Sequence, residues 1–173
     1  MKSERITFPN SCGENLAARL DLPGDEVPIA YALFAHCFTC TKNIKAAVNI
    51  AAALNRERIA VLRFDFTGLG QSEGDFADTN FTTNVADLVA AAGVMASQYQ
   101  APQIIIGHSL GGAAVLQAAQ AIALLKVVVT IGAPHYPGHV TRHFDMTREQ
   151  IEQKGSAEVD LAGRKFTIKK QFL

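Results

Sequence analysis

Apolar positions along the chain follow two different periods, and their order predicts the fold class. Residues 4–10 and 14–23 alternate apolar with polar, which is typical of two antiparallel strands joined by a turn. Further along, continuous apolar runs, which favour strands buried on both faces, alternate with stretches of helical spacing. The predicted strands cover residues 29–36, 59–66, 103–107 and 126–132, and the predicted helices cover residues 43–56, 81–99 and 109–123. This order predicts an α/β domain with a mostly parallel sheet.

The C-terminal part has a different pattern. Residues 139–144 and 147–154 predict short helices, and residues 157–170 alternate as a β-hairpin that turns at Ala162 and Gly163. Repeats, low-complexity tracts and linkers are absent from the sequence. We therefore interpret residues 1–173 as a single domain in which residues 135–173 are irregular, with short helices and a hairpin.

Composition limits the partners and the compartment. At 173 residues and 49% hydrophobic, the chain can bury roughly 70% of its unfolded surface around one core. Lys plus Arg and Asp plus Glu both number 16, so charge favours neither nucleic acid nor an anionic membrane. The start, MKSERITFPN, lacks the apolar segment of a signal peptide, and no apolar run approaches the roughly 20 residues of a membrane helix. We expect a cytoplasmic protein whose cysteines, Cys12, Cys37 and Cys40, are reduced.

The segment Gly107-His108-Ser109-Leu110-Gly111 carries the clearest chemical signal. It matches Gly-x-Ser-x-Gly and lies between a predicted buried strand and a helix rich in small residues. A serine at such a turn has a strained backbone, and the glycines two residues before and after it leave the space that it needs. The start of the following helix offers N–H groups to a developing oxyanion, with the Leu110 N–H as the natural donor. Glycines that served packing alone would not require a serine at the apex, so we predict a nucleophile at Ser109.

Three segments, FAHCFTC, VLRFDFTGLGQSEG and IIIGHSLGGAAVL, in this order and spacing, resemble the α/β-hydrolase superfamily over nearly the whole chain. The nearest likeness is the hydrolase half of bacterial proteins that fuse an α/β-hydrolase to an OsmC-like thiol-peroxidase domain, which this sequence lacks. The resemblance implies a three-layer sandwich with a mostly parallel central sheet. It also implies a serine hydrolase that acts on small carboxylic esters or related acyl compounds through an acyl-enzyme, without cofactor or metal. Ser109 would be the nucleophile, the N–H groups of Leu110 and Phe38 the oxyanion donors, and Asp65 a structural residue that holds a turn.

The acid and the base of a serine hydrolase triad are missing from their expected places. In these enzymes the chain order is Ser, then Asp or Glu, then His. No acid lies between Ser109 and the last histidine, His143, and no histidine follows Asp145. We therefore expect an N-terminal portion of a longer hydrolase that lacks the last two strand-helix units, and we expect the isolated chain to be nearly inactive.

Three histidines are candidates for pocket or supporting residues. His36 begins the predicted oxyanion loop and is expected to brace its backbone, while the side chain of His108 should diverge from that of its neighbour Ser109. His135 follows a predicted strand at the edge of the sheet where sites form, so it could line the pocket or substitute as base. A metal site is also conceivable from the spacing of His135, His139 and His143, but Pro137 and Gly138 interrupt the helix that it would need.

Parts of the sequence also fit a thiol-redox module, a dinucleotide site or a fragment that only binds or assembles. Cys37 and Cys40 form a Cys-x-x-Cys between a strand and a helix, which is typical of thiol-redox modules but leaves the Ser109 motif unexplained. A bond between these thiols would be expected to disturb the Phe38 donor. Residues 68–70 begin a dinucleotide fingerprint, but Glu73 stands where the third glycine belongs.

The last predicted strand has a physical consequence of its own. With two strands fewer than the full fold, the apolar segment 126–131 should lie at the sheet edge, where an unpaired strand seeks a partner. We expect either that the hairpin 157–170 covers it or that two chains pair there as a homodimer.

Overall fold

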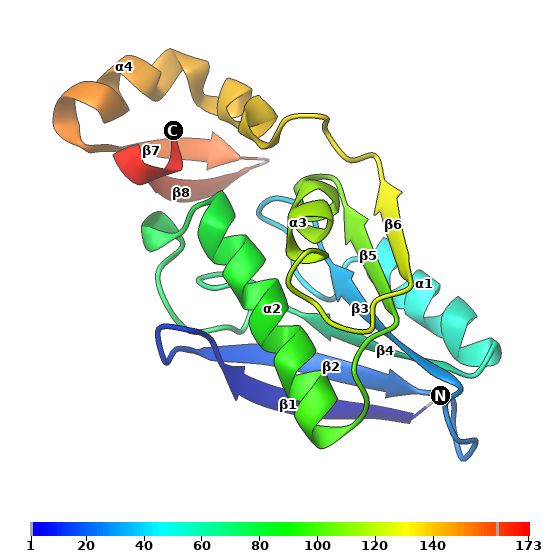
Figure 1. Cartoon of the computed structure of the whole chain (residues 1–173). Coiled ribbons are helices and arrows are strands. Elements are labelled where there is room, and N and C mark those ends of the chain that lie inside the picture. The colour runs from blue at the N-terminus through cyan, green and yellow to red at the C-terminus, as the bar shows by residue number, and fades with distance from the viewer. Residues whose placement is uncertain (1, 162) are drawn as a thin grey trace.

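The computed structural model describes residues 2–161 and 163–173, with the backbone alone at residues 139 and 143–146, and a six-stranded sheet forms its centre (Figure 1). The strands lie in the order β1-β2-β4-β3-β5-β6, and all neighbours from β4 to β6 are parallel. β2 pairs antiparallel with β1 and with β4. The strands are β1 (Lys2–Pro9), β2 (Asn15–Leu22), β3 (Ala30–Ala35), β4 (Ile59–Phe64), β5 (Ile104–His108) and β6 (Val127–Ile131).

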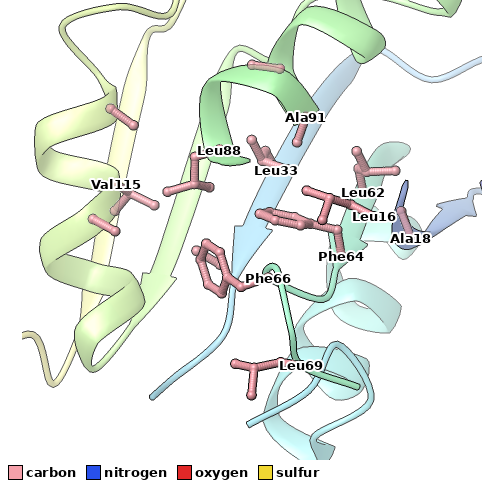
Figure 2. Packing of buried hydrophobic residues seen from close by; sticks show 14 of the residues in the cluster. Leu16, Ala18, Leu33, Leu62, Phe64, Phe66, Leu69, Leu88, Ala91 and Val115 are labelled. Atoms are coloured by element: carbon pink, nitrogen blue, oxygen red, sulfur yellow. The ribbon is translucent and has the colours of Figure 1, made fainter. Parts of the chain in front are cut away.

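Helices cover both faces of this sheet. α1 (Lys45–Arg56) packs on one face, where its buried Ala47 and Ala51 share a cluster with Phe34 of β3. α2 (Phe81–Gln98) and α3 (Leu110–Ala118) pack on the opposite face, where Leu88 and Val115 meet the larger cluster (Figure 2). The three layers confirm the predicted fold class, a mostly parallel sheet in an α/β-hydrolase sandwich. None of the helices in the described part of the chain is both long and apolar enough to cross a membrane.

The start of α2 follows from a local sequence signal. The side chain of Asn80 accepts a hydrogen bond from the Thr83 N–H at 3.0 Å, and the Asn80 N–H donates to the Thr83 hydroxyl at 2.9 Å. This reciprocal capping box satisfies two N–H groups at the helix start. Because α2 covers the larger cluster, the box also fixes where the helix begins relative to the sheet.

The C-terminal part folds back over the rest of the chain. It consists of the 3₁₀ segment η2 (Pro137–Phe144), α4 (Asp145–Lys154), β7 (Ser156–Leu161), β8 (Arg164–Lys169) and η3 (Lys170–Phe172). The predicted hairpin is therefore confirmed, although Ala162 in its turn lies outside the described residues. It packs on the short η1 (Phe76–Asp78), where the rings of Phe166 and Phe76 lie 5.0 Å apart and Lys169 pairs with Asp78 at 2.5 Å.

The hairpin does not cover β6, so that part of the sequence-based expectation is wrong. Val159, Leu161 and Ile168 are buried in the larger cluster, so the apolar face of the hairpin is used elsewhere. β6 pairs with β5 and forms the edge of the sheet. The exposed large apolar residues of β6 have 37% to 45% of their surface open: Val127, Val128, Val129 and Ile131.

Candidate active site

Ser109 lies at the turn between β5 and α3, in a strained backbone conformation. Its φ of 54° and ψ of −121° are unusual for a residue with a side chain. The Ser109 N–H donates to the carbonyl oxygen of Ile131 on β6 at 2.8 Å, and its own carbonyl accepts from the Gly112 N–H at 2.8 Å. Two hydrogen bonds therefore fix the main chain of the serine, and its side chain makes no capping bond to the helix.

The glycines around the serine are required by space. A Cβ atom on Gly107 would lie 2.2 Å from the carbonyl oxygen of Gly111, and one on Gly111 would lie 2.4 Å from the carbonyl oxygen of His36. Both distances are far inside van der Waals contact with backbone that cannot move away cheaply. Gly111 therefore lets the turn that carries Ser109 approach the loop that begins at His36.

A cavity of about 710 Å³ opens in front of the serine. Its walls come from the loop after β3, the turn that carries Ser109, the segment after β6, η2 and the end of β7. They include Ser109, Phe38 and the exposed His135. Leu110, the other expected oxyanion donor, opens α3, where the first N–H groups of a helix have no partner within it. The structure thus brings the predicted nucleophile, a predicted donor and His135 to one cavity, with Leu110 adjacent to it.

The ring of Phe38 packs against two other aromatic rings. The ring lies 5.7 Å from that of Phe76 and 5.5 Å from that of Phe172, so the aromatic group packs toward η1 and the C-terminal residues. The partly buried side chain holds the middle of the loop, and Cys37, Phe38 and Thr39 border the same cavity as Ser109. η1 and η3 thereby support the loop, and local sequence does not reveal these contacts.

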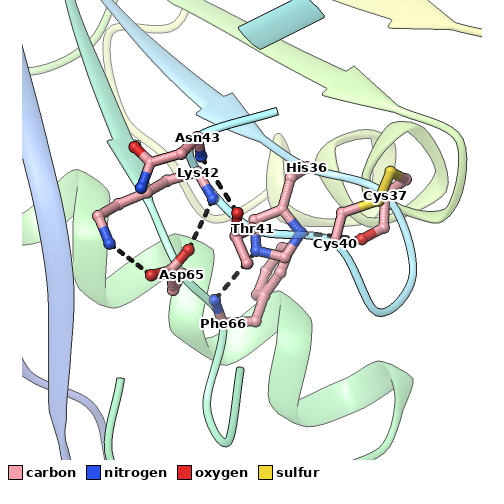
Figure 3. The surroundings of a disulfide bond; sticks show 8 residues. All are labelled: His36, Cys37, Cys40, Thr41, Lys42, Asn43, Asp65 and Phe66. Carbon is pink, nitrogen blue, oxygen red and sulfur yellow. Dashed lines mark hydrogen bonds and ion pairs between the residues drawn. A yellow bond between two sulfur atoms is a disulfide. The ribbon is translucent and has the colours of Figure 1, made fainter. Parts of the chain in front are cut away.

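Cys37 and Cys40 form a disulfide in this loop (Figure 3). This overturns the expectation of reduced thiols at these two positions, since a turn closed by the Cys40 N–H on the Cys37 carbonyl at 3.1 Å brings their Cα atoms within 5.3 Å. Cys12 is free and exposed, as expected. Phe38 and Thr39 border the cavity with the disulfide in place, and Thr39 has a φ of 56°.

His36 braces the loop and is held neutral. Its Nδ1 donates to the Cys37 carbonyl at 2.8 Å, and its Nε2 accepts from the Phe66 N–H at 3.4 Å. Burial lowers the pKa of His36 to about 4, because the interior disfavours the charged ring. Both ring nitrogens are therefore hydrogen-bonded to backbone groups of the loop and of the turn after β4.

His108 neighbours Ser109 in the chain but lies outside the cavity wall. It is half-buried, does not line the cavity, and its buried Nδ1 has no hydrogen-bond partner in the described part of the chain. Among the predicted supporting histidines, only His135 is in the cavity wall. The side chains of His139 and His143 lie outside the described residues, so the metal site that would involve them stays untested.

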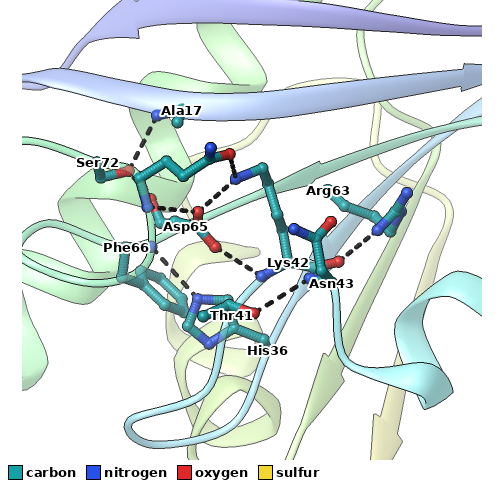
Figure 4. Close-up of polar contacts among 10 residues, drawn as sticks. Ala17, His36, Thr41, Lys42, Asn43, Arg63, Asp65, Phe66 and Ser72 are labelled. Atoms are coloured by element: carbon teal, nitrogen blue, oxygen red, sulfur yellow. Dashed lines mark hydrogen bonds and ion pairs between the residues drawn. The ribbon is translucent and has the colours of Figure 1, made fainter.

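A buried ion pair closes the loop at its far end (Figure 4). Lys42 Nζ lies 2.5 Å from Asp65 Oδ2, with side chains 3% and 1% exposed, and the Lys42 N–H donates to Asp65 Oδ1 at 2.6 Å. Asp65 also accepts from the Gln71 N–H at 3.0 Å, and a Cβ on Gly70 would lie 2.3 Å from its carboxylate. Asp65 therefore holds the turn after β4, as the family resemblance implies, while no local sequence pattern marks its partner Lys42.

The same turn does not cradle a dinucleotide. A Cβ on Gly68 would lie 2.1 Å from the Phe76 nitrogen, and the Gly68 N–H donates to the Glu73 carbonyl at 2.9 Å. The first helix after residues 68–70 is the short η1, where the N-cap Asp75 side chain already accepts from the Ala77 N–H at 2.9 Å. Packing and turn closure account for these glycines.

Asp87 is another buried group whose pKa is shifted. Burial raises its pKa to about 6, although hydrogen bonds from the Thr67 N–H at 2.9 Å and the Thr67 hydroxyl favour the ionised form. It lies on α2 and does not line the cavity in front of Ser109. Its role is therefore to tie α2 to the turn after β4.

Comparisons with known proteins point to one family. A family model described as "Alpha/beta hydrolase family" matches residues 32–170. The esterase domain of a Rhodothermus marinus protein is 52% identical, with a TM-score of 0.72 over 99% of this chain and 66% of that one. Alpha/beta hydrolase domain-containing protein 10 from mouse is 25% identical, with a TM-score of 0.74 over 98% of this chain and 67% of that one.

A curated relative is similar over a shorter stretch. The rat protein named "Palmitoyl-protein thioesterase ABHD10, mitochondrial" is 33% identical over 127 residues, which are 71% of this chain and 41% of that protein. The mouse protein of the same name is 36% identical over 100 residues, or 32% of its length. The chain thus spans well under half of these curated relatives.

Proposed function

This chain belongs to the alpha/beta hydrolase family, and from that premise we propose that it carries the nucleophile and the oxyanion hole of a serine hydrolase for carboxylic esters or thioesters. The observation that carries the proposal is Ser109, strained at the strand-to-helix turn and open to a cavity that Phe38 also borders. Esters are suggested by the Rhodothermus esterase domain, and thioesters by the name of the rat relative.

The reaction begins when Ser109 Oγ attacks the carbonyl carbon of the substrate. The negative charge on the former carbonyl oxygen is stabilised by the N–H groups of Leu110 and Phe38. Collapse of this intermediate expels the alcohol or thiol and leaves an acyl-enzyme, which water then hydrolyses to release the acid. The serine proton must pass to a base, and His135 is the candidate in the cavity wall.

The cavity suits an acyl chain of some length. Its volume of about 710 Å³ exceeds the space of a small acyl group. Val140 and Leu161 in its wall favour apolar contacts, while Arg142 and His135 add polar groups.

The likeness to hydrolases fused with an OsmC-like domain and the cytoplasmic location stay predictions, and the curated relatives carry "mitochondrial" in their names.

Labelling with a fluorophosphonate tests the proposal. We expect intact-mass analysis to show one phosphonate on the chain, absent from Ser109→Ala. His135→Ala should slow labelling if His135 accepts the serine proton, whereas His108→Ala, its matched control, should not. Equal labelling of Ser109→Ala would refute the nucleophile assignment, and no labelling of either protein would favour the inactive binding or assembly fragment.

A thiol-redox function is the second candidate, favoured by the Cys37–Cys40 disulfide. It predicts that iodoacetamide labels both residues after mild reduction and that a dithiol substrate exchanges rapidly with the bond. It gives no reason for the strained serine. Rapid exchange in Ser109→Ala, together with no phosphonate labelling of the unaltered chain, would favour this function over the hydrolase.

A further inference from the structure

A row of arginines crosses the sheet on the face that carries α1. Arg5 of β1 lies directly opposite Arg19 of β2 in the antiparallel register, and Arg19 lies opposite Arg63 of β4. Side chains opposite one another in such pairs share a face of the sheet, with Cβ atoms about 5 Å apart. Like charges at these positions repel, so a nearby anion would stabilise the row.

Of the three arginines in this row, only Arg63 has its charge balanced by a carboxylate of the described residues. Arg63 Nε donates to Asp21 Oδ2 at 2.6 Å, with both side chains almost fully buried. The neighbouring Lys42 is paired with Asp65. In the described part of the chain, neither Arg5 nor Arg19 takes part in an ion pair.

Arg19 presents the sharper problem of the two. Its Nε is buried and has no hydrogen-bond partner among the described residues. A charged donor withdrawn from water without an acceptor is costly, and such groups in folded proteins usually have a partner. Arg19 Nε therefore lacks an acceptor, and a negatively charged one would suit the guanidinium best.

A cavity lies at this point of the molecule. It has a volume of about 340 Å³, and Arg5, Arg19 and Lys42 line it together with Thr7, Asn43 and Gln71. None of the residues that line it is a carboxylate. The Gln71 amide oxygen already accepts from Lys42 Nζ at 2.9 Å, so its NH₂ group is the end left for a ligand. The lining therefore combines uncompensated positive charge with neutral donors.

We propose that this cavity, lined by Arg5 and Arg19, binds a small phosphate-bearing anion. Guanidinium groups match the paired oxygens of a phosphate, and an anion between the two arginines replaces repulsion with attraction. The site is separate from the cavity in front of Ser109, which shares no lining residue with it. Free phosphate and a phosphate monoester share this chemistry, and the cavity has space for the latter.

An amide NMR titration of the whole chain at constant ionic strength tests the proposal, with inorganic phosphate in one arm and glycerol 3-phosphate in the other. We expect saturable shifts centred on residues 5–7 and 17–19, and the arm that binds more tightly identifies the source of the phosphate. Arg19→Gln should weaken binding about tenfold or more, or about 1.4 kcal/mol. Arg56→Gln, an exposed arginine at the end of α1, is the matched control and should bind as the unaltered chain does.

The variants are expected to fold, because loss of one arginine relieves the repulsion within the row. At low ionic strength without phosphate, Arg19→Gln should unfold at a temperature no lower than that of the unaltered chain. Arg5→Gln, at a more exposed position, gives a second test of the same site. The proposal is wrong if neither anion saturates, or if Arg19→Gln and Arg5→Gln both bind with unchanged affinity.

Discussion

Gly107 and Gly111 approach each other so closely beneath the serine that a Cβ on Gly107 would lie 2.2 Å from the Gly111 carbonyl oxygen. Gly107→Ala should therefore lower the free energy of unfolding by about 3 kcal/mol, because the clash is with backbone. Gly93→Ala is the matched control, since Gly93 lies in α2 with nothing near its Cβ position. Denaturant unfolding should show this control to be more stable by about 0.5–1 kcal/mol. A Gly107→Ala variant of unchanged stability would contradict the crowding.

His36 and Asp87 should give opposite dependences of stability on pH. The folded-state pKa of His36, about 4, is below its ordinary value of 6.5, so the unfolded chain binds that proton more readily, and stability falls as pH drops from about 6.5 to 4. The folded-state pKa of Asp87, about 6, is above its ordinary value of 3.8. The contribution of Asp87 to stability is therefore complete below pH 3.8 and is lost as pH rises toward 6. The two effects oppose each other over the same range.

Asp87→Asn separates these two effects. The variant keeps an acceptor for Thr67 and carries no charge, so it should be more stable than the unaltered chain at pH 8 by up to about 3 kcal/mol, with the difference vanishing near pH 4. Its own stability should fall as pH drops from 6.5, since the His36 contribution is then unopposed. Urea unfolding across pH measures both. A constant difference between the two proteins from pH 4 to 8 would show that Asp87 titrates normally in the fold.

Reduction of the Cys37–Cys40 bond should alter the reactivity of Ser109. With the bond formed, Phe38 borders the cavity. We expect loss of the bond to loosen the loop and to slow phosphonate labelling of Ser109 about tenfold. This effect is smaller than the roughly 100-fold effect of removing an oxyanion donor. Cys40→Ser should label slowly with or without reductant, and its rate should not respond to peroxide.

The free cysteine gives the control for this effect. Cys12→Ser should respond to reductant as the unaltered chain does, because Cys12 is unpaired and exposed. Faster labelling after reduction would instead support the view that the bond disturbs the Phe38 donor. Equal peroxide sensitivity of Cys40→Ser and the unaltered chain would show that the Cys37–Cys40 bond does not regulate the reactivity of Ser109.

The open edge of β6 should support self-association. Val128 is 37% exposed on a strand that pairs on one side only, and Val128→Lys should weaken any dimer more than about tenfold by placing a charge at the edge. Val27→Lys is the control, since Val27 is 77% exposed and lies outside the strands. Sedimentation at increasing concentration measures this. A single species at all concentrations would exclude pairing through this edge.

The elements whose signals are local could be predicted from the sequence. Apolar periodicity predicts the strands and helices, and the small residues around Ser109 predict the strand-to-helix turn that carries it. Both signals depend only on neighbours within a few positions of the chain. The Lys42–Asp65 pair, the Asp87–Thr67 bonds and the docking of Phe166 on Phe76 join residues that are 20 or more positions apart. Nothing in the periodicity encodes such contacts, and the same reason explains why the hairpin was expected on β6.

The hydrogen bond from the Ser109 N–H to the Ile131 carbonyl makes the edge strand β6 a support for the proposed nucleophile. A strand with one free side frays more readily than its inner neighbours. The main chain of Ser109 is therefore held by a strand that is itself paired on one side only. A chain that pairs with β6 would make the turn at Ser109 more rigid and would also bury the valines. Self-association and the orientation of the serine hydroxyl are therefore coupled.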